Sequence, residues 1–81
     1  MVKLYEGQKI RIEEVGTGKK LKKNKSKIGV IARRYKKYIR IQFEKYMGSL
    51  TNADIIAQDT SGLLITVKEN GSWIKATKEM L

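Results

Sequence analysis

The 81 residues of this chain suffice for one domain with one modest core and leave no room for a second domain. Cysteine and histidine are both absent, which excludes disulfides, thiolate metal sites and histidine-based acid/base chemistry. We therefore predict neither a metal nor a cofactor. The formal charge of +10 at pH 7 is large for so short a chain and points to an anionic partner.

Catalysis and membrane insertion are not expected. Asp54 and Asp59 have no basic partner of tunable pKa nearby, and the serines have no histidine to activate them. The N-terminal residues lack the apolar segment of a signal peptide, and no apolar run approaches the roughly 18 residues of a membrane helix. We expect a cytoplasmic protein that is not an enzyme, has no small-molecule substrate and has no membrane partner.

The positive charge is concentrated in residues 15–43. This stretch holds eleven basic residues and no acidic one, whereas the other fifty-two residues hold seven basic and eight acidic residues. The eleven are Lys19, Lys20, Lys22, Lys23, Lys25, Lys27, Arg33, Arg34, Lys36, Lys37 and Arg40. Such segregation is typical of a site for a polyanion, and the alternative is a solvated surface that keeps the protein soluble.

Short runs rich in Ile, Val, Tyr and Thr, with no proline, predict an all-β domain. The first predicted strand, residues 8–13, alternates apolar and charged side chains, so Ile10 and Ile12 face the core. Residues 16–26 contain one apolar residue among many lysines and are predicted to form a loop.

A β-hairpin is predicted from residues 28–34 and 38–43, with its turn centred on Lys36 and Lys37. Its register places two pairs on the buried side, Val30 with Phe43 and Ala32 with Ile41, and two on the outer side, Arg33 with Arg40 and Tyr35 with Tyr38. Like charges directly opposite one another weaken a sheet. An anionic ligand would supply a reason for cations at this position.

The C-terminal part contains the strongest local signal, Asn70-Gly71, which predicts a hairpin of residues 63–68 and 72–76. Its register pairs Val67 with Ile74 and Ile65 with Ala76 on the apolar side, and Lys68 with Trp73 and Thr66 with Lys75 on the other. Residues 47–52 are predicted as a loop and residues 55–57 as a short strand or a turn. Thr77 is predicted to cap a terminal turn, with Met80 or Leu81 closing the end of the barrel.

About five strands, a long basic loop after the first strand and a C-terminal hairpin predict a small five-stranded SH3-like barrel covering residues 1–81. An OB-like barrel is the nearest alternative.

The central segment also resembles a known family. Residues 29–43 begin with a Gly-aliphatic-aliphatic-Ala motif, continue with Tyr35, and end in an aromatic-aliphatic-x-aliphatic-Gln-apolar strand. This order, with the preceding basic loop and a following segment that ends at residues 53–56, resembles the Veg family of small bacterial proteins. The resemblance covers residues 7–56 and implies an SH3-like barrel that regulates gene expression through nucleic acid or a transcription factor. The strand that begins at Gly29 is also similar to KOW-type modules.

The leading hypothesis is a regulatory nucleic-acid-binding module for duplex DNA or structured RNA, with modest sequence specificity. The lysines would contact phosphates, while arginine forks and tyrosine rings would contact base edges and unpaired bases. Trp73 is either a stacking platform or a residue buried under a loop. The alternative is a protein-interaction module that binds an acidic partner or a transcription factor. The candidate binding residues are Lys19, Lys20, Lys22, Lys23, Lys25, Lys27, Arg33, Arg34, Tyr35, Lys36, Lys37, Tyr38, Arg40 and Trp73.

Overall fold

The computed structural model describes residues 3–14 and 25–81. Their elements, in chain order, are β1 (Lys9–Glu14), β2 (Lys25–Arg34), β3 (Tyr38–Phe43), β4 (Met47–Thr51), α1 (Asn52–Ile56), α2 (Gln58–Ser61), β5 (Leu63–Glu69), β6 (Ser72–Lys75) and the 3₁₀ turn η1 (Lys78–Met80). Most of the predicted loop at 16–26 lies outside the described residues, and its last two residues belong to β2. The all-β prediction is confirmed, with two short helices added.

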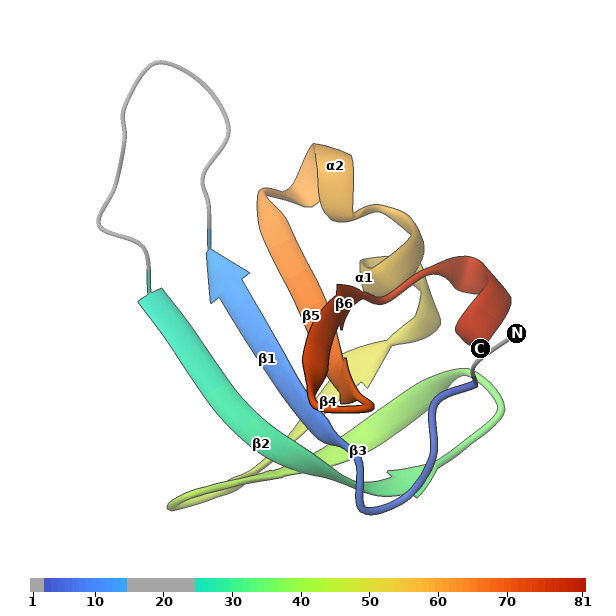
Figure 1. Ribbon diagram of the computed structural model, residues 1–81. Coiled ribbons are helices and arrows are strands. Elements are labelled where there is room, and N and C mark those ends of the chain that lie inside the picture. Colours follow the sequence, from blue (N-terminus) through green and yellow to red (C-terminus); the bar gives the residue numbers. More distant parts are fainter. Residues whose placement is uncertain (1–2, 15–24) are drawn as a thin grey trace.

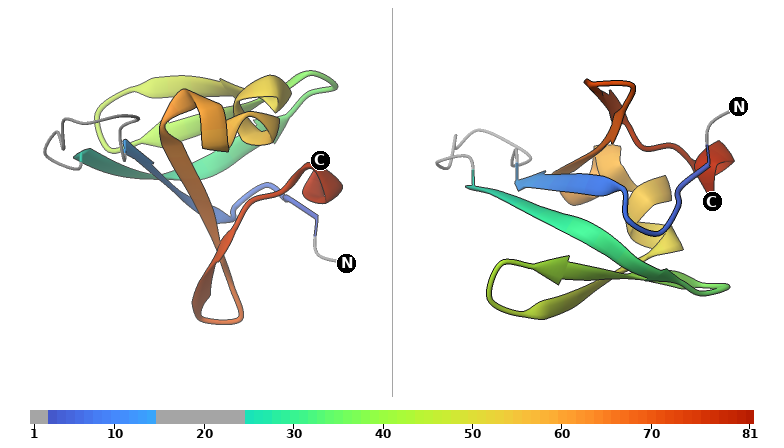
Figure 2. Two further views of the ribbon diagram at one scale, coloured as in Figure 1. Left: turned by 90° about the horizontal axis from the view of Figure 1, so that it is seen from above. Right: turned by 60° about the horizontal axis from the view of Figure 1, so that its bottom comes forward.

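The strands form one antiparallel sheet in the order β4-β3-β2-β1-β5-β6 (Figure 1). The sheet is strongly twisted and curls around the core, and the β5–β6 hairpin projects from the rest of it (Figure 2). The edge strands β4 and β6 do not pair with one another, so the described part of the chain is an open sheet. Its strands number six, where five were predicted.

The additional strand is β4, which corrects the prediction of a loop over residues 47–52. Gly48 and Ser49 are typical loop residues, but here they alternate with a buried Leu50 along the edge of the sheet. Gly48 leaves space for the Phe43 ring, because a Cβ at this position would lie 2.6 Å from Cε2 of Phe43. The strand is therefore specified by its contact with β3, which the local sequence does not reveal.

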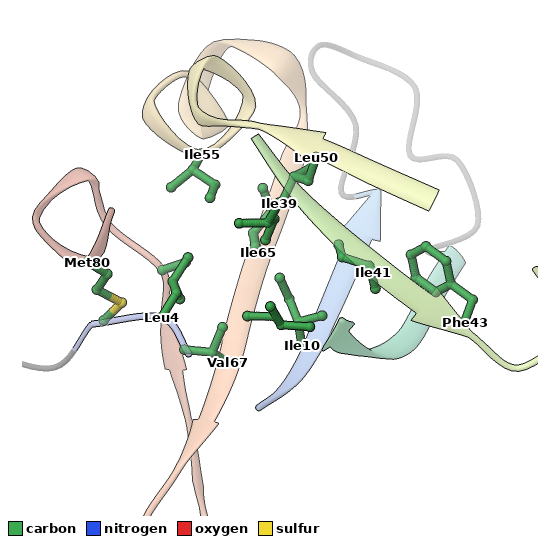
Figure 3. Packing of buried hydrophobic residues seen from close by; sticks show 12 residues of the cluster. Leu4, Ile10, Ile39, Ile41, Phe43, Leu50, Ile55, Ile65, Val67 and Met80 are labelled. Atoms are coloured by element: carbon green, nitrogen blue, oxygen red, sulfur yellow. The ribbon is translucent and has the colours of Figure 1, made fainter. Parts of the chain in front are cut away.

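Residues 55–57 form neither a strand nor an isolated turn, because most of them belong to α1. The helix begins with a capping box: the Thr51 hydroxyl accepts a hydrogen bond from the Asp54 backbone N–H (3.1 Å), and the Asp54 carboxylate accepts one from the Thr51 N–H (3.0 Å). Ile55 is buried and points from α1 toward the core (Figure 3). The capping residues thus turn the chain from β4 into a helix.

The β2–β3 hairpin has the predicted register near its turn and a different one further away. Arg33 pairs with Arg40 as predicted. The register then shifts between Ile31 and Arg33, so the predicted inward positions of Val30 and Ala32 are wrong. Ile31 is buried instead, and Val30 is exposed.

The physical reason for this shift lies at Gly29. Gly29 pairs with Phe43 on the inner side of the sheet, and a Cβ at Gly29 would lie 2.6 Å from Cγ2 of Ile41. The pairing of Gly29 with Phe43 and of Ile31 with Ile41 fills the core without a side chain at position 29. The extra residue, Ala32, is accommodated by a β-bulge.

The C-terminal hairpin has the predicted register, with Val67 opposite Ile74 and Lys68 opposite Trp73. Asn70 and Gly71 have φ angles of 50° and 82°, as a two-residue hairpin turn requires. Thr77 stands at the N-cap of η1, but its side chain makes no capping hydrogen bond, which corrects that prediction.

The core lies inside the curl of the sheet, and Leu4 and Met80 lie at one end of it (Figure 3). Ile10 is fully buried as predicted, whereas Ile12 is only partly buried. Met80 is buried, and its carbonyl accepts a hydrogen bond from the Leu4 N–H (3.0 Å), which joins the N-terminal segment to η1. The opposite side of the sheet, called here the outer face, carries the candidate site.

Candidate nucleic-acid interface

Two cross-strand pairs define the candidate site at the tip of the β2–β3 hairpin. Arg33 lies opposite Arg40, and the rings of Tyr35 and Tyr38 stack with their centroids 4.6 Å apart and an interplanar angle of 18°. All four side chains are exposed. The hairpin therefore presents a row of two cations beside a row of two aromatic rings. We call these four residues the Arg/Tyr cluster.

The turn that carries the Arg/Tyr cluster is fixed from two sides. The Tyr35 N–H donates to the Tyr38 carbonyl (2.8 Å), which closes the hairpin. Asn52, the first residue of α1, donates its side-chain amide to the Lys36 carbonyl (3.0 Å) and its backbone N–H to the Lys37 carbonyl (2.9 Å). These bonds hold the exposed side chains on a backbone of defined geometry.

A shallow depression of about 540 Å³ adjoins the cluster on the side of β4. Its lining residues are Lys37, Tyr38, Arg40, Ser49 and Thr51. The two hydroxyl residues come from β4, where Thr51 lies opposite Tyr38 and Ser49 lies opposite Arg40. Neither residue was predicted from the sequence, because residues 47–52 were predicted to form a loop. The polar-apolar-polar order of Ser49, Leu50 and Thr51 is a weak sequence signal, because three residues are too few to predict a strand.

The cluster has no acidic partner among the described residues. No carboxylate in that part of the chain lies within ion-pair distance of Arg33 or Arg40. Asp54 is the acidic residue adjoining this end of β4, and its carboxylate is engaged in the capping box of α1. The arginines are therefore available to an external anion.

The lysines of the predicted basic surface are not brought to this cluster. Lys19, Lys20, Lys22 and Lys23 lie outside the described residues, and the rest of the basic surface is divided between the two ends of β2. Lys25 begins β2 and Arg34 ends it. Lys27 and Arg33 are six residues apart, which is about 20 Å along an extended strand. The exposed side chains of Ile28 and Val30 lie between them. The described residues thus do not form one continuous cationic surface.

Lys27 belongs to a separate group at the far end of β2. Its ammonium lies 5.5 Å from the centre of the Tyr46 ring, and its interaction with the Tyr46 side chain raises the pKa of Lys27 above the ordinary value. Arg34, Lys36 and Lys37 are exposed beside the Arg/Tyr cluster, at the other end of the strand.

Trp73 lies on β6, which is separated from β3 by three strands of the sheet. Its side chain is partly buried, so Trp73 is neither the exposed stacking platform nor the buried residue that the sequence allowed. The Arg11 guanidinium lies 4.7 Å from its ring centre and the Lys68 ammonium 5.9 Å. Arg11 also forms an ion pair with Glu13 (2.8 Å). Trp73 is thus engaged with cations of its own face and is separate from the Arg/Tyr cluster.

Within residues 3–14 and 25–81, no group of three acidic side chains is arranged to hold a metal ion. No helix in these ranges has the length and apolar character needed to cross a membrane.

No family model, no curated protein and no solved structure matches the chain.

Proposed function

We propose that the protein is a small nucleic-acid-binding module whose binding surface includes the Arg/Tyr cluster. The observation that carries the proposal is the pair of opposed arginines, Arg33 and Arg40, which are exposed, lack an acidic partner among the described residues and lie beside two stacked tyrosines. Opposed like charges cost a few tenths of a kcal/mol in a sheet. Binding of a polyanion would offset this unfavourable free energy, and the guanidinium group of arginine matches the geometry of phosphate.

An SH3-like fold and a role in gene regulation are both compatible with nucleic-acid binding. The order of the first five strands, in which β5 pairs with β1, is compatible with an SH3-like barrel that is open at one side and extended by β6. The resemblance of residues 7–56 to the Veg family supports a role in bacterial gene regulation. The lysines of residues 19–27 would add phosphate contacts beyond the Arg/Tyr cluster, with little preference for sequence.

The test is a titration of duplex DNA and of a folded RNA hairpin at several salt concentrations. If four to six phosphates are contacted, log K should fall with log salt with a slope of about −4 to −5 on duplex DNA. The double variant Arg33→Ala/Arg40→Ala should bind more weakly, and its slope should be shallower by about two because each arginine contacts a phosphate.

The matched control is Lys3→Ala/Lys78→Ala, which removes the same charge from exposed positions outside the cluster. This control should bind almost as the wild type does. Binding without salt dependence, absence of binding at low salt, or equal losses in the two double variants would contradict the proposal. Unfolding curves of both variants check that the fold is retained.

A second candidate function, a protein-interaction module, is favoured by apolar side chains on the outer face. Ile28, Val30 and Met47 are 55%, 37% and 46% exposed. Val30 and Met47 lie on either side of Gln42 in neighbouring strands. Recovery of one defined acidic protein or transcription factor from nuclease-treated lysate, undiminished by the nuclease, would favour this function over nucleic-acid binding.

A further inference from the structure

The two tyrosines of the Arg/Tyr cluster are not equivalent. Tyr35 follows the end of β2 in the hairpin turn, Tyr38 begins β3, and the depression lies beyond Tyr38 on the side of β4. Tyr38 lines the depression, whereas Tyr35 does not. Since the rings stack on each other, Tyr35 covers one face of Tyr38 and the depression adjoins the other side of Tyr38. A planar ligand in the depression would extend the stack to three rings.

The other residues that line the depression carry groups that can bind the phosphate, sugar and base of a nucleotide. Arg40 and Lys37 provide cations for a phosphate. The Thr51 hydroxyl oxygen accepts the Asp54 N–H, which leaves its proton free to donate, and the Ser49 hydroxyl has no hydrogen-bond partner in the described part of the chain. These hydroxyls can bond to a sugar or a base edge. The depression, about 540 Å³ in volume, is shallow and open to solvent, so a ligand in it would remain partly exposed.

Only an unpaired base can use this arrangement. In a duplex, each base is already stacked between its neighbours, so its face is not accessible to Tyr38. In single-stranded segments, loops and bulges, the face of a base is available, and stacking on aromatic side chains is the usual mode of binding.

We infer that the depression binds one unpaired nucleotide, with its base stacked on Tyr38 and its phosphate held by Arg40 and Lys37. Tyr35 is a positioning residue that supports the Tyr38 ring from behind. This inference rests on the proposed function and makes it more specific, because the protein then prefers nucleic acid that contains an unpaired segment to a blunt duplex of the same charge.

The test compares two labelled probes by fluorescence anisotropy, a hairpin with a single-stranded loop and a blunt duplex with the same number of phosphates. The wild type should bind the looped probe more tightly. Tyr38→Leu should lose about tenfold in affinity for the looped probe and little for the duplex, because base stacking on an aromatic ring is removed. Tyr38→Phe should retain the preference, since the ring remains.

Tyr35 provides the matched comparison. Tyr35→Leu should weaken binding of the looped probe by a smaller factor than Tyr38→Leu does. Tyr35→Phe, which keeps the ring, should bind the looped probe as tightly as the wild type. Equal affinities of the wild type for the two probes, or equal effects of Tyr38→Leu on both, would overturn the inference while leaving the proposed function in place. Failure of the wild type to bind either probe would overturn the proposed function itself. Unfolding curves establish that each leucine variant is folded.

Discussion

At the scale of single residues, Gln58 is the polar side chain that most directly joins separate parts of the fold. Its amide nitrogen donates to the carbonyls of Ile55 (2.9 Å) and Ala76 (2.8 Å), and its amide oxygen accepts the Ile65 N–H (2.8 Å). The side chain is only 4% exposed. It therefore links α1, β5 and the segment after β6 by hydrogen bonds that are shielded from water.

We predict that Gln58→Met lowers the free energy of unfolding by about 3 kcal/mol. The new side chain has a similar volume, but it leaves buried backbone groups at Ile65 and Ala76 without partners, which costs about 1–3 kcal/mol per group. Urea denaturation followed by circular dichroism measures the loss. Gln42→Met is the control, because Gln42 is exposed and its hydrogen bonds to neighbouring carbonyls are exposed or only partly buried. This substitution should cost less than about 1 kcal/mol. Comparable losses in the two variants would show that burial of Gln58 is not the cause.

At the scale of elements, two glycines allow the neighbouring strands to pack closely. A Cβ at Gly29 would lie 2.8 Å from the Gln42 carbonyl oxygen, so relief requires movement of the β3 backbone. The three atoms nearest to a Cβ at Gly48 all belong to the ring of Phe43, which is 9% exposed. The backbone of a paired strand is harder to displace than the ring of Phe43.

Gly29→Ala should therefore destabilise the protein by about 1–3 kcal/mol, and Gly48→Ala should cost less. Thermal or urea unfolding of both variants measures which of them loses more free energy of unfolding. The substitutions add the same methyl group to neighbouring parts of one sheet, so each serves as the control for the other. A larger loss in Gly48→Ala would mean that the Phe43 ring is held more firmly than the β2–β3 backbone pairing.

The elements also show how far the sequence determines the fold. The β5–β6 hairpin was predicted in the correct register because its signal is local: Asn70-Gly71 fixes the turn, and the register follows from it. The bulge at Ala32 was not predictable in the same way. Val30 and Ile31 are both aliphatic, so alternation alone does not decide which one is buried, and the decision depends on the space around Gly29.

The candidate site was predictable to a similar extent. The facing of Arg33 with Arg40 and of Tyr35 with Tyr38 followed from the position of the turn. Ser49 and Thr51 could not be added, because they reach the depression only through the pairing of β4 with β3. Residues brought together by a strand whose own pattern is weak are visible only in the folded structure.

At the scale of the whole molecule, the charge of +10 connects function with stability. Like charges repel in the folded state, and the repulsion is strongest where cations are held close together without counterions. Arg33 and Arg40 are such a pair. The feature proposed to bind phosphate is therefore expected to destabilise the protein in the absence of its ligand, as is common for binding sites.

This leads to a prediction in which one substitution has opposite effects on binding and stability. Arg40→Gln should weaken nucleic-acid binding, yet at low salt it should raise the free energy of unfolding by a few tenths of a kcal/mol, because it removes the repulsion with Arg33. The gain should disappear near 1 M NaCl, where the Debye length is only about 3 Å. Urea denaturation of both proteins at the two salt concentrations measures the difference. Lys78→Gln, which changes one exposed charge on η1, should show a smaller gain. If Arg40→Gln is less stable than the wild type at low salt, then Arg40 stabilises the free protein, and the argument that its placement serves an external anion fails.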